Sequence, residues 1–507
     1  MNEDPLPSTP GDFRLEASNL GPLAEAAVDL RPLTVFVGPS NTGKSYLATL
    51  LYALHRSFSE RFPASPVGRD LFTRLIWGGT DLDEATSRDL RDWLSRAEAE
   101  EGAAPFPSSL ESAVRRSIEQ PLGLAQGLAD KVRWCFGVDS LERLVRHGQR
   151  AATRVSLRIP RPSSSGNLDY RFNSHSDDIS LSGRIGGQPS VFGDCTPDSL
   201  ESVLKEMQNP LLSLGMVSEP GADRDLDRLL RLLTVRVRQS LLHPFQRSAY
   251  YLPADRTGVM HSHRVVVSSL IRSAGSAGLR PTDDLPLLPG VLADFLDQLL
   301  TLGRPQALFP AAAVRPSETI QPLAERFEQA VLRGAVRTDS TAANYPEFLY
   351  RPAGWRRDLP LTQASSMVSE LAPIVLYLRH LVRLGDVLII EEPEAHLHPA
   401  MQVEVTRRLA ELVEAGVRIV ITTHSEWVLE ELANLIRLSQ VDDRREPALH
   451  PDRVGVWRFH PPEEKDGASV TEIEMGDAGL FEAGYEQVAM EVHNRWADLA
   501  GLANNGG

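Results

Sequence analysis

The sequence predicts an α/β fold in which a mixed or parallel sheet is interrupted by a large, mostly helical insertion. Three observations predict it. A glycine-rich loop, GPSNTGKS, follows the apolar run LTVFV and precedes a helical pattern. Strand and helix patterns alternate between residues 387 and 423. Between about residues 60 and 247, by contrast, the sequence becomes helical and variable in composition.

The N-terminal elements follow from periodicity. Two short alternating segments, FRLEAS and AEAAVDL, predict a pair of strands before the buried strand LTVFV. Apolar residues at helical spacing in SYLATLLYALHRSF predict a helix directly after the glycine-rich loop. Within the insertion, turn-forming residues separate ATRVSLRIP, LDYRF and ISLSGRIGG, which therefore predict a small meander of strands.

The second half begins with a predicted helix, DRDLDRLLRLLTVRVRQSLL, and the strand-like AYYLPADR. GAVRTD and EFLYRPAGWRRDLPL predict further strands, and SSMVSELAPIVLYLRHLVRLG predicts a long apolar helix that ends at Gly385. A helix from Pro399 to Ala415 separates DVLIIEEPE from VRIVITT, and this alternation implies a parallel sheet. The tail predicts a hairpin of RVGVWRF and VTEIEM and a final amphipathic helix.

Composition limits the function classes. The chain has 507 residues and a formal net charge of −15, which argues against coating nucleic acid with the whole surface but leaves a local basic groove open. Its two cysteines have no metal-ligand spacing, and a reduced cytoplasm fits them best. The acidic, proline-rich start does not resemble a signal peptide, and no run of about 18 apolar residues occurs. We therefore expect a cytoplasmic protein without a membrane span.

The glycine-rich loop fits the pattern GxxxxGK[ST]. In this pattern the glycines let backbone N–H groups and a helix N-terminus point at phosphate. Lys44 would reach the β- and γ-phosphates, and Ser45 would bind Mg²⁺. The alternative, a chance match in a Gly/Ser loop, is weak because the motif lies between a strand and a helix, as the chemistry requires.

Two carboxylates end the apolar strand of residues 387–390. Ligands bind at the C-terminal ends of strands in open α/β sheets. Glu391 would hold the Mg²⁺ shell, and Glu392 would accept a proton from the attacking water. His424 ends a second buried strand, where it could donate a hydrogen bond to the γ-phosphate. The alternatives are a solvated acidic turn and a structural histidine.

These motifs together resemble ATP-binding-cassette (ABC-type) ATPases of the kind found in chromosome-maintenance and DNA-repair heads. More closely, the chain resembles the overcoming-lysogenization-defect-like ATPases and their relatives in bacterial defence. The matching segments are NLGPLAEAAVDLRPLTVFVGPSNTGKS, LTQASSMVSELAPIVLYL, GDVLIIEEPEAHLHP and ITTHS. They cover roughly 100 residues in the expected order, and the resemblance implies a P-loop head of the ABC type.

The resemblance implies a role for each matching residue. Glu391 corresponds to the Walker B acid, Glu392 to the catalytic base and His424 to the switch histidine. Residues 395–398 correspond to the D-loop, which contacts the second subunit of a dimer. Ser365 and Ser366 correspond to the signature motif that caps the ATP of the opposite subunit. The implied ATP cradle consists of Gly38, Asn41, Thr42, Gly43, Lys44 and Ser45.

The implied assembly is a homodimer or higher oligomer in which ATP is sandwiched between subunits, with a protein effector as a further partner. Two positions depart from the usual pattern. Glu391 stands where an aspartate is usual, and Met367 stands where a glycine is common in the signature. The first predicts a shifted metal contact with retained activity, and the second predicts slow hydrolysis.

The domain organisation follows from the motif positions. We expect the N-terminal part of the ATPase lobe at residues 1–60 and an insertion lobe of helices and small strands at residues 61–247. The C-terminal part of the ATPase lobe follows at residues 248–450, with a hairpin and helix at residues 451–507. Some relatives end in a Toprim nuclease domain, but the 83 residues after His424 lack its length and carboxylate pattern.

Two further segments remain open. An arginine run in the insertion could track phosphates, although a solvated face is the favoured interpretation; its members are Arg143, Arg146, Arg150, Arg154, Arg158 and Arg161. Arg256, after YLPAD, could contact phosphate or the partner subunit, or could belong to a structural turn.

The favoured function is an ATP-hydrolysing enzyme that dimerises on ATP and acts as a sensing or regulatory subunit in anti-phage defence or DNA-linked maintenance. The alternative is a nucleotide-gated scaffold with negligible hydrolysis, and a transporter subunit is disfavoured. DNA binding remains open but is not indicated by the net charge.

Overall fold

The computed structural model describes the elements that carry these motifs. The described residues are 13–59, 107–120, 122–146, 151–162, 166–175, 178–187, 190–194, 222–262, 288–302, 317–340, 346–440, 448–462 and 467–473, with isolated positions between 84 and 93 and at 494.

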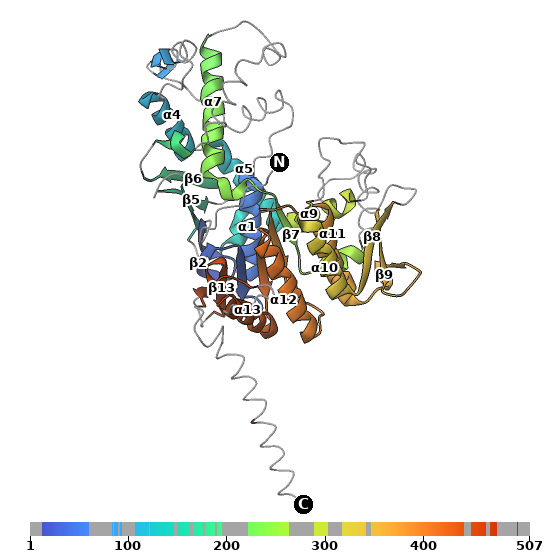
Figure 1. Ribbon diagram of the computed structural model, residues 1–507. Coiled ribbons are helices and arrows are strands. Elements are labelled where there is room, and N and C mark those ends of the chain that lie inside the picture. The colour runs from blue at the N-terminus through green and yellow to red at the C-terminus, as the bar shows by residue number, and fades with distance from the viewer. Residues whose placement is uncertain are drawn as a thin grey trace, which may run out of the picture.

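Eleven strands form one mixed sheet (Figure 1). Its parallel part contains, in spatial order, β13 (Val454–His460), β3 (Leu33–Val37), β12 (Arg418–Thr423), β11 (Val387–Glu391) and β7 (Ala249–Leu252). Three of these strands precede the predicted functional loops. Their C-terminal ends therefore meet at one edge of the sheet.

The rest of the sheet is largely antiparallel. β1 (Phe13–Leu20) pairs with both β2 (Leu23–Leu30) and β4 (Arg154–Pro160). The predicted meander continues from β4 through β5 (Asn167–His175) to β6 (Asp178–Ile185). The predicted hairpin of β13 and β14 (Ala468–Glu472) lies between β2 and β3. The predicted α/β class with a mixed sheet is thus confirmed, and the insertion contributes its strands to this sheet.

Two hydrophobic cores cover the two faces of the parallel part. On β3, Phe36 belongs to the first core, whereas Val35 and Val37 belong to the second. Strands buried on both faces read as nearly continuous apolar runs, which explains LTVFV and VLII. Helices of the first core are α1 (Lys44–Phe58), α4 (Ser108–Glu119), α5 (Leu122–Phe136) and α7 (Ala222–Leu241).

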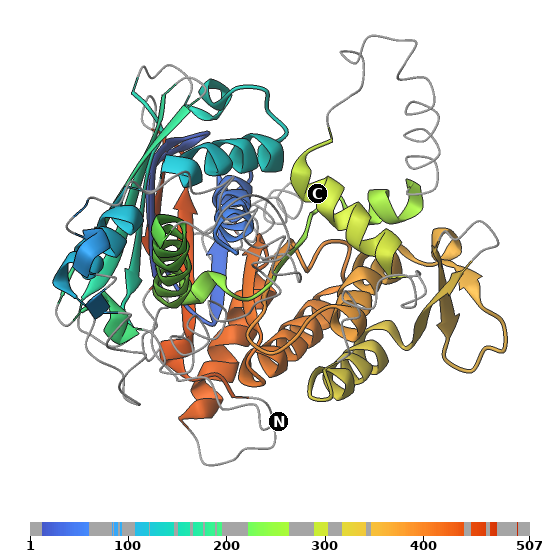
Figure 2. The ribbon, with the colours of Figure 1, turned by 90° about the horizontal axis from the view of Figure 1, so that it is seen from above.

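The second core lies under α9 (Gly290–Thr301), α10 (Ile320–Phe327), α11 (Ser366–His380), α12 (Pro399–Glu414) and α13 (Glu426–Ser439). Figure 2 shows this helical group on one side of the sheet and α1 on the other. Beside it lies a separate three-stranded sheet of β8 (Gly334–Ser340), β9 (Pro346–Pro352) and β10 (Leu359–Pro360). This small sheet leads directly into α11.

Short helices complete the described elements. They are η1 (Leu141–Leu144), η2 (Val191–Asp194), η4 (His243–Phe245), the π-helix η8 (Glu328–Leu332), η9 (Leu361–Gln363) and η10 (Pro451–Arg453). Among the described helices, none is both long enough and apolar enough to cross a membrane.

One predicted boundary is wrong. The helix expected to end at Gly385 ends at His380, because the carbonyl of Tyr377 accepts both the Leu381 and Val382 N–H groups and closes the last turn. Gly385 instead has a φ of 82° in the turn before β11. The predicted final amphipathic helix lies outside the described residues, and the four domain boundaries stay a prediction.

Candidate nucleotide-binding and catalytic site

The loop between β3 and α1 needs its glycines. Gly38 has a φ of 141° and Gly43 a φ of 98°. A Cβ at Gly38 would lie 2.3 Å from the carbonyl oxygen of Phe459, and one at Gly43 would lie 2.6 Å from Leu23. Both positions therefore require glycine. Asn41, also with a positive φ of 63°, is exposed on the same loop.

The first turn of α1 is suited to an anion. Gly43 caps the helix without a side-chain hydrogen bond, and no acidic residue lies in the first turn. The N–H groups of a first helical turn lack intrahelical acceptors, and the helix dipole favours negative charge there. The loop thus fits a phosphate group, as its sequence predicts.

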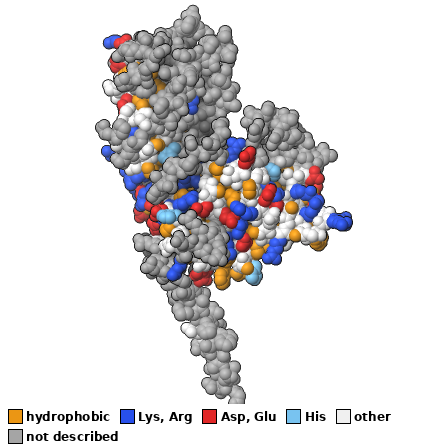
Figure 3. Space-filling model, in the orientation of Figure 1, with side chains coloured by type: hydrophobic (Ala, Val, Ile, Leu, Met, Phe, Trp, Pro, Cys, Tyr) orange, Lys and Arg blue, Asp and Glu red, His pale blue; other side chains and the backbone are white. Residues whose placement is uncertain are grey.

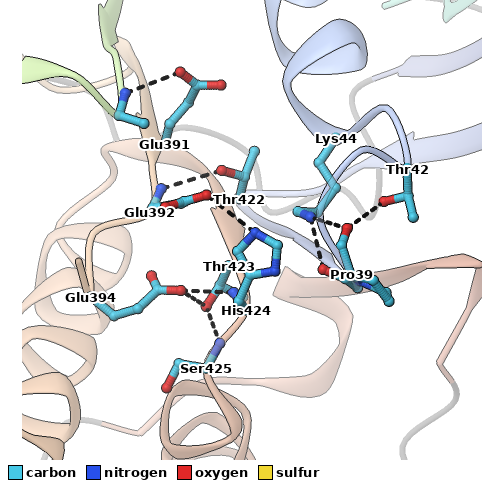
Figure 4. A network of polar contacts seen from close by, with 12 residues as sticks. Pro39, Thr42, Lys44, Glu391, Glu392, Glu394, Thr422, Thr423, His424 and Ser425 are labelled. Carbon is cyan, nitrogen blue, oxygen red and sulfur yellow. Dashed lines mark hydrogen bonds and ion pairs between the residues drawn. The ribbon is translucent and has the colours of Figure 1, made fainter. Parts of the chain in front are cut away.

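Lys44 lies inside this loop and is 5% exposed. Its Nζ donates to the carbonyl oxygens of Gly38 and Pro39, at 2.7 Å each, and the Thr42 hydroxyl donates to the Pro39 carbonyl at 2.8 Å (Figure 4). Burial lowers the pKa of Lys44 to about 8, while the carboxylates of Glu392, Glu394 and Glu391 act in the opposite direction. A phosphate would give this ammonium an anionic acceptor in place of neutral carbonyls.

Glu391 ends β11 and is 8% exposed. Its Oε2 accepts a hydrogen bond of 3.1 Å from the N–H of Ala254, just beyond β7. Burial, followed by the Glu391 carboxylate, raises the pKa of Tyr251. The Ser45 hydroxyl is exposed in the first turn of α1. Carboxylate and hydroxyl oxygens are suitable Mg²⁺ ligands, so these two residues could hold the ion.

Glu392 and His424 form a pair across two neighbouring strand ends. Glu392 has a left-handed φ of 43°, and its N–H donates to the carbonyl of Thr422 at 2.9 Å. Its Oε1 lies 3.1 Å from Nε2 of His424. The hydrogen bond from His424 lowers the pKa of Glu392, so the carboxylate is ionised at neutral pH. A strained, ionised carboxylate at this edge is suited to accept a proton.

Glu394 also belongs to the site, although its role was missed in the sequence. It is 9% exposed, and its Oε1 accepts 2.6 Å and 2.7 Å hydrogen bonds from the Thr423 hydroxyl and the His424 N–H. Burial raises its pKa, and these two hydrogen bonds oppose that shift. Glu394 therefore fixes the backbone that carries His424. The third glutamate of EEPE was the available signal.

Gln402, on α12, connects the predicted D-loop with the segment after His424. Its Nε2 donates to the Leu397 carbonyl at 2.9 Å, and its Oε1 accepts a hydrogen bond from the Ser425 hydroxyl. His398 caps α12 by accepting the Ala400 N–H at 3.3 Å. The loop of residues 395–398 is thus attached to the histidine-bearing strand end.

Arg256 is fully buried, which rules out contact with phosphate or a partner subunit in this conformation. Its guanidinium donates to the carbonyl oxygens of Glu391 and Glu392 at 2.5 and 3.0 Å. It also lies 2.6 Å from Oε1 of Glu370, on α11. These contacts favour the structural alternative. Arg256 donates to the Pro253 carbonyl in its own turn, at 3.0 Å, as well as to the end of β11 and to α11.

The predicted signature residues lie away from these contacts, at the N-terminus of α11. Ser365 caps the helix by accepting the Val368 N–H at 3.4 Å. Ser365 and Ser366 are both exposed, whereas Met367 packs partly against the second core. Among the described residues, no side-chain hydrogen bond joins either serine to the Lys44 loop. The structure thus brings together the loop, Glu391, Glu392 and His424, and leaves the serines apart.

The arginine run does not form one track. Arg143 pairs with Asp139 and Arg158 with Asp169, at 3.0 and 2.9 Å. Arg161 is buried and donates to backbone carbonyls, including that of Gly186. Arg150 lies outside the described residues. Arg143 and Arg158 are exposed and paired with carboxylates, which fits the favoured solvated face, whereas Arg161 is buried and does not fit it.

Comparisons with known proteins bear on the same region. No curated protein matches the chain. Three solved structures cover 91 to 96% of the chain at 11% identity. They are an SmcHead bound to the C-winged helix domain of ScpA (TM-score 0.38, 98% of that chain), an Smc head domain with an extended coiled coil bound to the C-terminal domain of ScpA from Pyrococcus furiosus (0.36, 100%) and an SMC head domain from Thermotoga maritima (0.34, 98%).

A family model described as an AAA ATPase domain matches residues 321–429. This span contains Glu391, Glu392 and His424, together with the serines of α11. Lys44 and its loop lie outside it. The chain is therefore similar to an AAA ATPase domain over the segment that carries its candidate catalytic residues.

Proposed function

We propose that this protein binds and hydrolyses ATP with Mg²⁺. The observation that carries the proposal is the meeting of three strand ends. β3 leads to the Lys44 loop, β12 to His424, and β11 to Glu391 and Glu392, and these strands are parallel neighbours. The influence of all three nearby glutamates on the pKa of Lys44 supports the same assignment.

Each residue has a definite part in this proposal. The loop N–H groups and Lys44 bind the phosphates, and Ser45 and Glu391 hold Mg²⁺, which neutralises charge on the phosphates when bound. Glu392 accepts the proton of the attacking water. His424, held to Glu392 at 3.1 Å, exchanges this contact for the γ-phosphate when ATP is present.

The proposed assembly is a homodimer in which each ATP lies between the Lys44 loop of one subunit and the α11 N-terminus of the other. Exposure of Ser365 and Ser366, without any side-chain hydrogen bond to the loop in the described part of their own chain, supports this arrangement. A pair of equal surfaces related by a two-fold axis closes into a dimer. Hydrolysis by Glu392 would then release the two subunits.

We place this activity in the cytoplasm, as a sensing or regulatory subunit with a protein effector. The motif resemblance to overcoming-lysogenization-defect-like ATPases supports a role in bacterial anti-phage defence or in DNA-linked maintenance. Slow hydrolysis is expected because Met367 stands at a signature position where glycine permits closer approach of the backbone to phosphate.

The test is phosphate release from Mg²⁺-ATP by the wild-type protein, by Glu392→Gln, and by Lys44→Ala as the blank. Loss of a general base is expected to lower turnover by about 10²-fold or more. Glu392→Gln should still bind ATP. If the wild-type protein binds ATP and forms dimers but releases phosphate no faster than Lys44→Ala, the proposed hydrolysis is wrong. The protein would then be a nucleotide-gated scaffold.

A further inference from the structure

The turn between β9 and β10, residues 353–358, carries an exposed tryptophan. Trp355 is 58% exposed, more than any other large apolar side chain in the described part of the chain. The residues beside it, from Ala353 to Arg357, are also exposed. The indole ring is therefore accessible to a ligand that offers a flat apolar face.

Five arginines lie in the segments that meet at this turn: Arg333, Arg337, Arg351, Arg356 and Arg357. The single carboxylate among them, Asp358, is engaged by two. Arg351 donates to it at 2.8 Å, and Arg337 also pairs with it, which lowers the pKa of Asp358. Within the described residues, Arg333, Arg356 and Arg357 form no ion pair. The turn is therefore locally basic on a chain of net charge −15.

The backbone holds this turn in a defined conformation. The Trp355 N–H donates to the Pro352 carbonyl at 3.1 Å, and the Ala353 N–H donates to the Arg333 carbonyl at 2.9 Å. Gly354 has a φ of 79°, which a residue with a side chain seldom adopts. Figure 3 shows basic side chains where the small sheet reaches the right-hand edge of the molecule. The backbone that carries Trp355, Arg356 and Arg357 is thus preorganised, which lowers the entropic cost of binding.

We propose that residues 353–358, with Arg333, form a binding site for single-stranded nucleic acid. A base would stack on Trp355, and Arg356 and Arg357 would contact the flanking phosphates. An acidic protein segment is the alternative, because tryptophan and arginine are also enriched at protein interfaces. Such a segment would pair with the arginines, but it offers the indole no base to stack on, so single-stranded nucleic acid matches both parts of the turn. A duplex is also disfavoured, since its stacked bases offer no free face.

The salt dependence of binding gives a quantitative test of the proposal. Because the basic area is small, only a few phosphates can be neutralised. Each phosphate contact steepens the salt dependence of single-strand affinity by about 0.7 in log–log slope. Removing Arg356 and Arg357 together should therefore make the slope shallower by about 1.4.

The experiment measures binding of a fluorescein-labelled oligothymidylate to the full chain by anisotropy, over a salt series and without nucleotide. Trp355→Ala should weaken binding by about 5- to 150-fold, the range of one stacked base, and Trp355→Phe should recover part of it. Arg356→Gln with Arg357→Gln should give the shallower slope. Trp427→Ala, at a 51% exposed tryptophan on α13, and Arg143→Gln, at an exposed arginine of η1, are matched controls.

Three results would overturn the proposal: no binding by the wild-type protein, equal loss in the controls, or equal competition by poly-glutamate with no effect of Trp355→Ala. The last result would mean that the basic charge attracts any acidic polymer and that Trp355 stacks on no base. Because the assay omits ATP and leaves the Lys44 loop unchanged, its failure leaves the ATPase proposal standing, and failure of the ATPase proposal leaves this binding site standing.

Discussion

The catalytic edge of the large sheet and the N-terminus of α11 differ in how complete they are. At the sheet edge, Lys44, Glu391, Glu392 and His424 all have hydrogen-bond partners within the chain. At α11, Ser365 makes one capping bond of 3.4 Å, and both serines face solvent. One chain brings together the proposed catalytic residues, whereas the surface that would complete the proposed ATP site is exposed.

The two regions are nevertheless joined through the interior. Arg256 contacts the carbonyls at the end of β11 and the Glu370 carboxylate on α11, while Thr257 donates to the same carboxylate. A buried charge is retained only where such partners are complete. The exposed serines at the N-terminus of α11 are therefore carried by a helix whose position is fixed relative to Glu392.

The largest expected effect is on stability. Glu370→Ala leaves the buried Arg256 charge without its partner and should lower the free energy of unfolding by about 3–5 kcal/mol. Glu16→Ala, which breaks a half-exposed pair with Arg14, should cost about 0–1 kcal/mol. Equilibrium unfolding in urea measures both. Equal losses in the free energy of unfolding would contradict the claim that the buried network contributes more than a surface pair. If Glu370→Ala does not fold, Glu370→Gln is compared with Glu16→Ala instead.

An intermediate effect concerns pH. Lys44 loses its proton above about pH 8 in the free protein, because burial lowers its pKa, and only the charged form attracts phosphate. ATP affinity should therefore fall by up to about tenfold per pH unit above pH 8. Titrations of the wild-type protein with a non-hydrolysable ATP analogue between pH 7 and 9.5 measure this dependence, because they keep Glu392, whose carboxylate acts on the pKa of Lys44. Adding Lys44→Arg should flatten the profile; a flat profile with Lys44 present would contradict the explanation.

The smallest effect separates the two serines. Ser365→Ala removes the α11 cap and should lower the free energy of unfolding by about 1 kcal/mol. The Ser366 side chain forms no hydrogen bond in the described part of the chain, so Ser366→Ala should change the free energy of unfolding by less than about 0.5 kcal/mol. Urea unfolding measures the global term, and amide exchange at Val368 measures the local one. A larger loss for Ser366→Ala than for Ser365→Ala would contradict the assignment of Ser365 as the helix cap.

The sequence was informative where a local pattern determines the structure. Apolar runs such as LTVFV predict buried strands directly. The glycines predict the Lys44 loop, because their backbone conformations exclude other residues. Contacts between residues far apart in the chain could not be predicted from the sequence. Nothing local indicates that Arg256 meets Glu370 across 114 residues, or that β4 extends the sheet beside β1.

The same distinction applies within the catalytic loop. Glu391 and Glu392 were predicted because they end an apolar strand, whereas Glu394 was missed because its importance lies in two hydrogen bonds to the next strand. The helix boundary at His380 depends on a double hydrogen bond to Tyr377, which periodicity does not indicate. Residues that act through tertiary contacts thus escaped sequence reasoning.

The central claim is that ATP joins the catalytic edge of one chain to the α11 N-terminus of another. The most direct test is the solution mass of Glu392→Gln by light scattering, with and without Mg²⁺-ATP. We predict a single-chain mass without ATP and twice that mass with ATP. Adding Ser366→Arg should abolish the dimer while ATP still binds. A single-chain mass with ATP bound, or a dimer that persists with Ser366→Arg, would contradict the account.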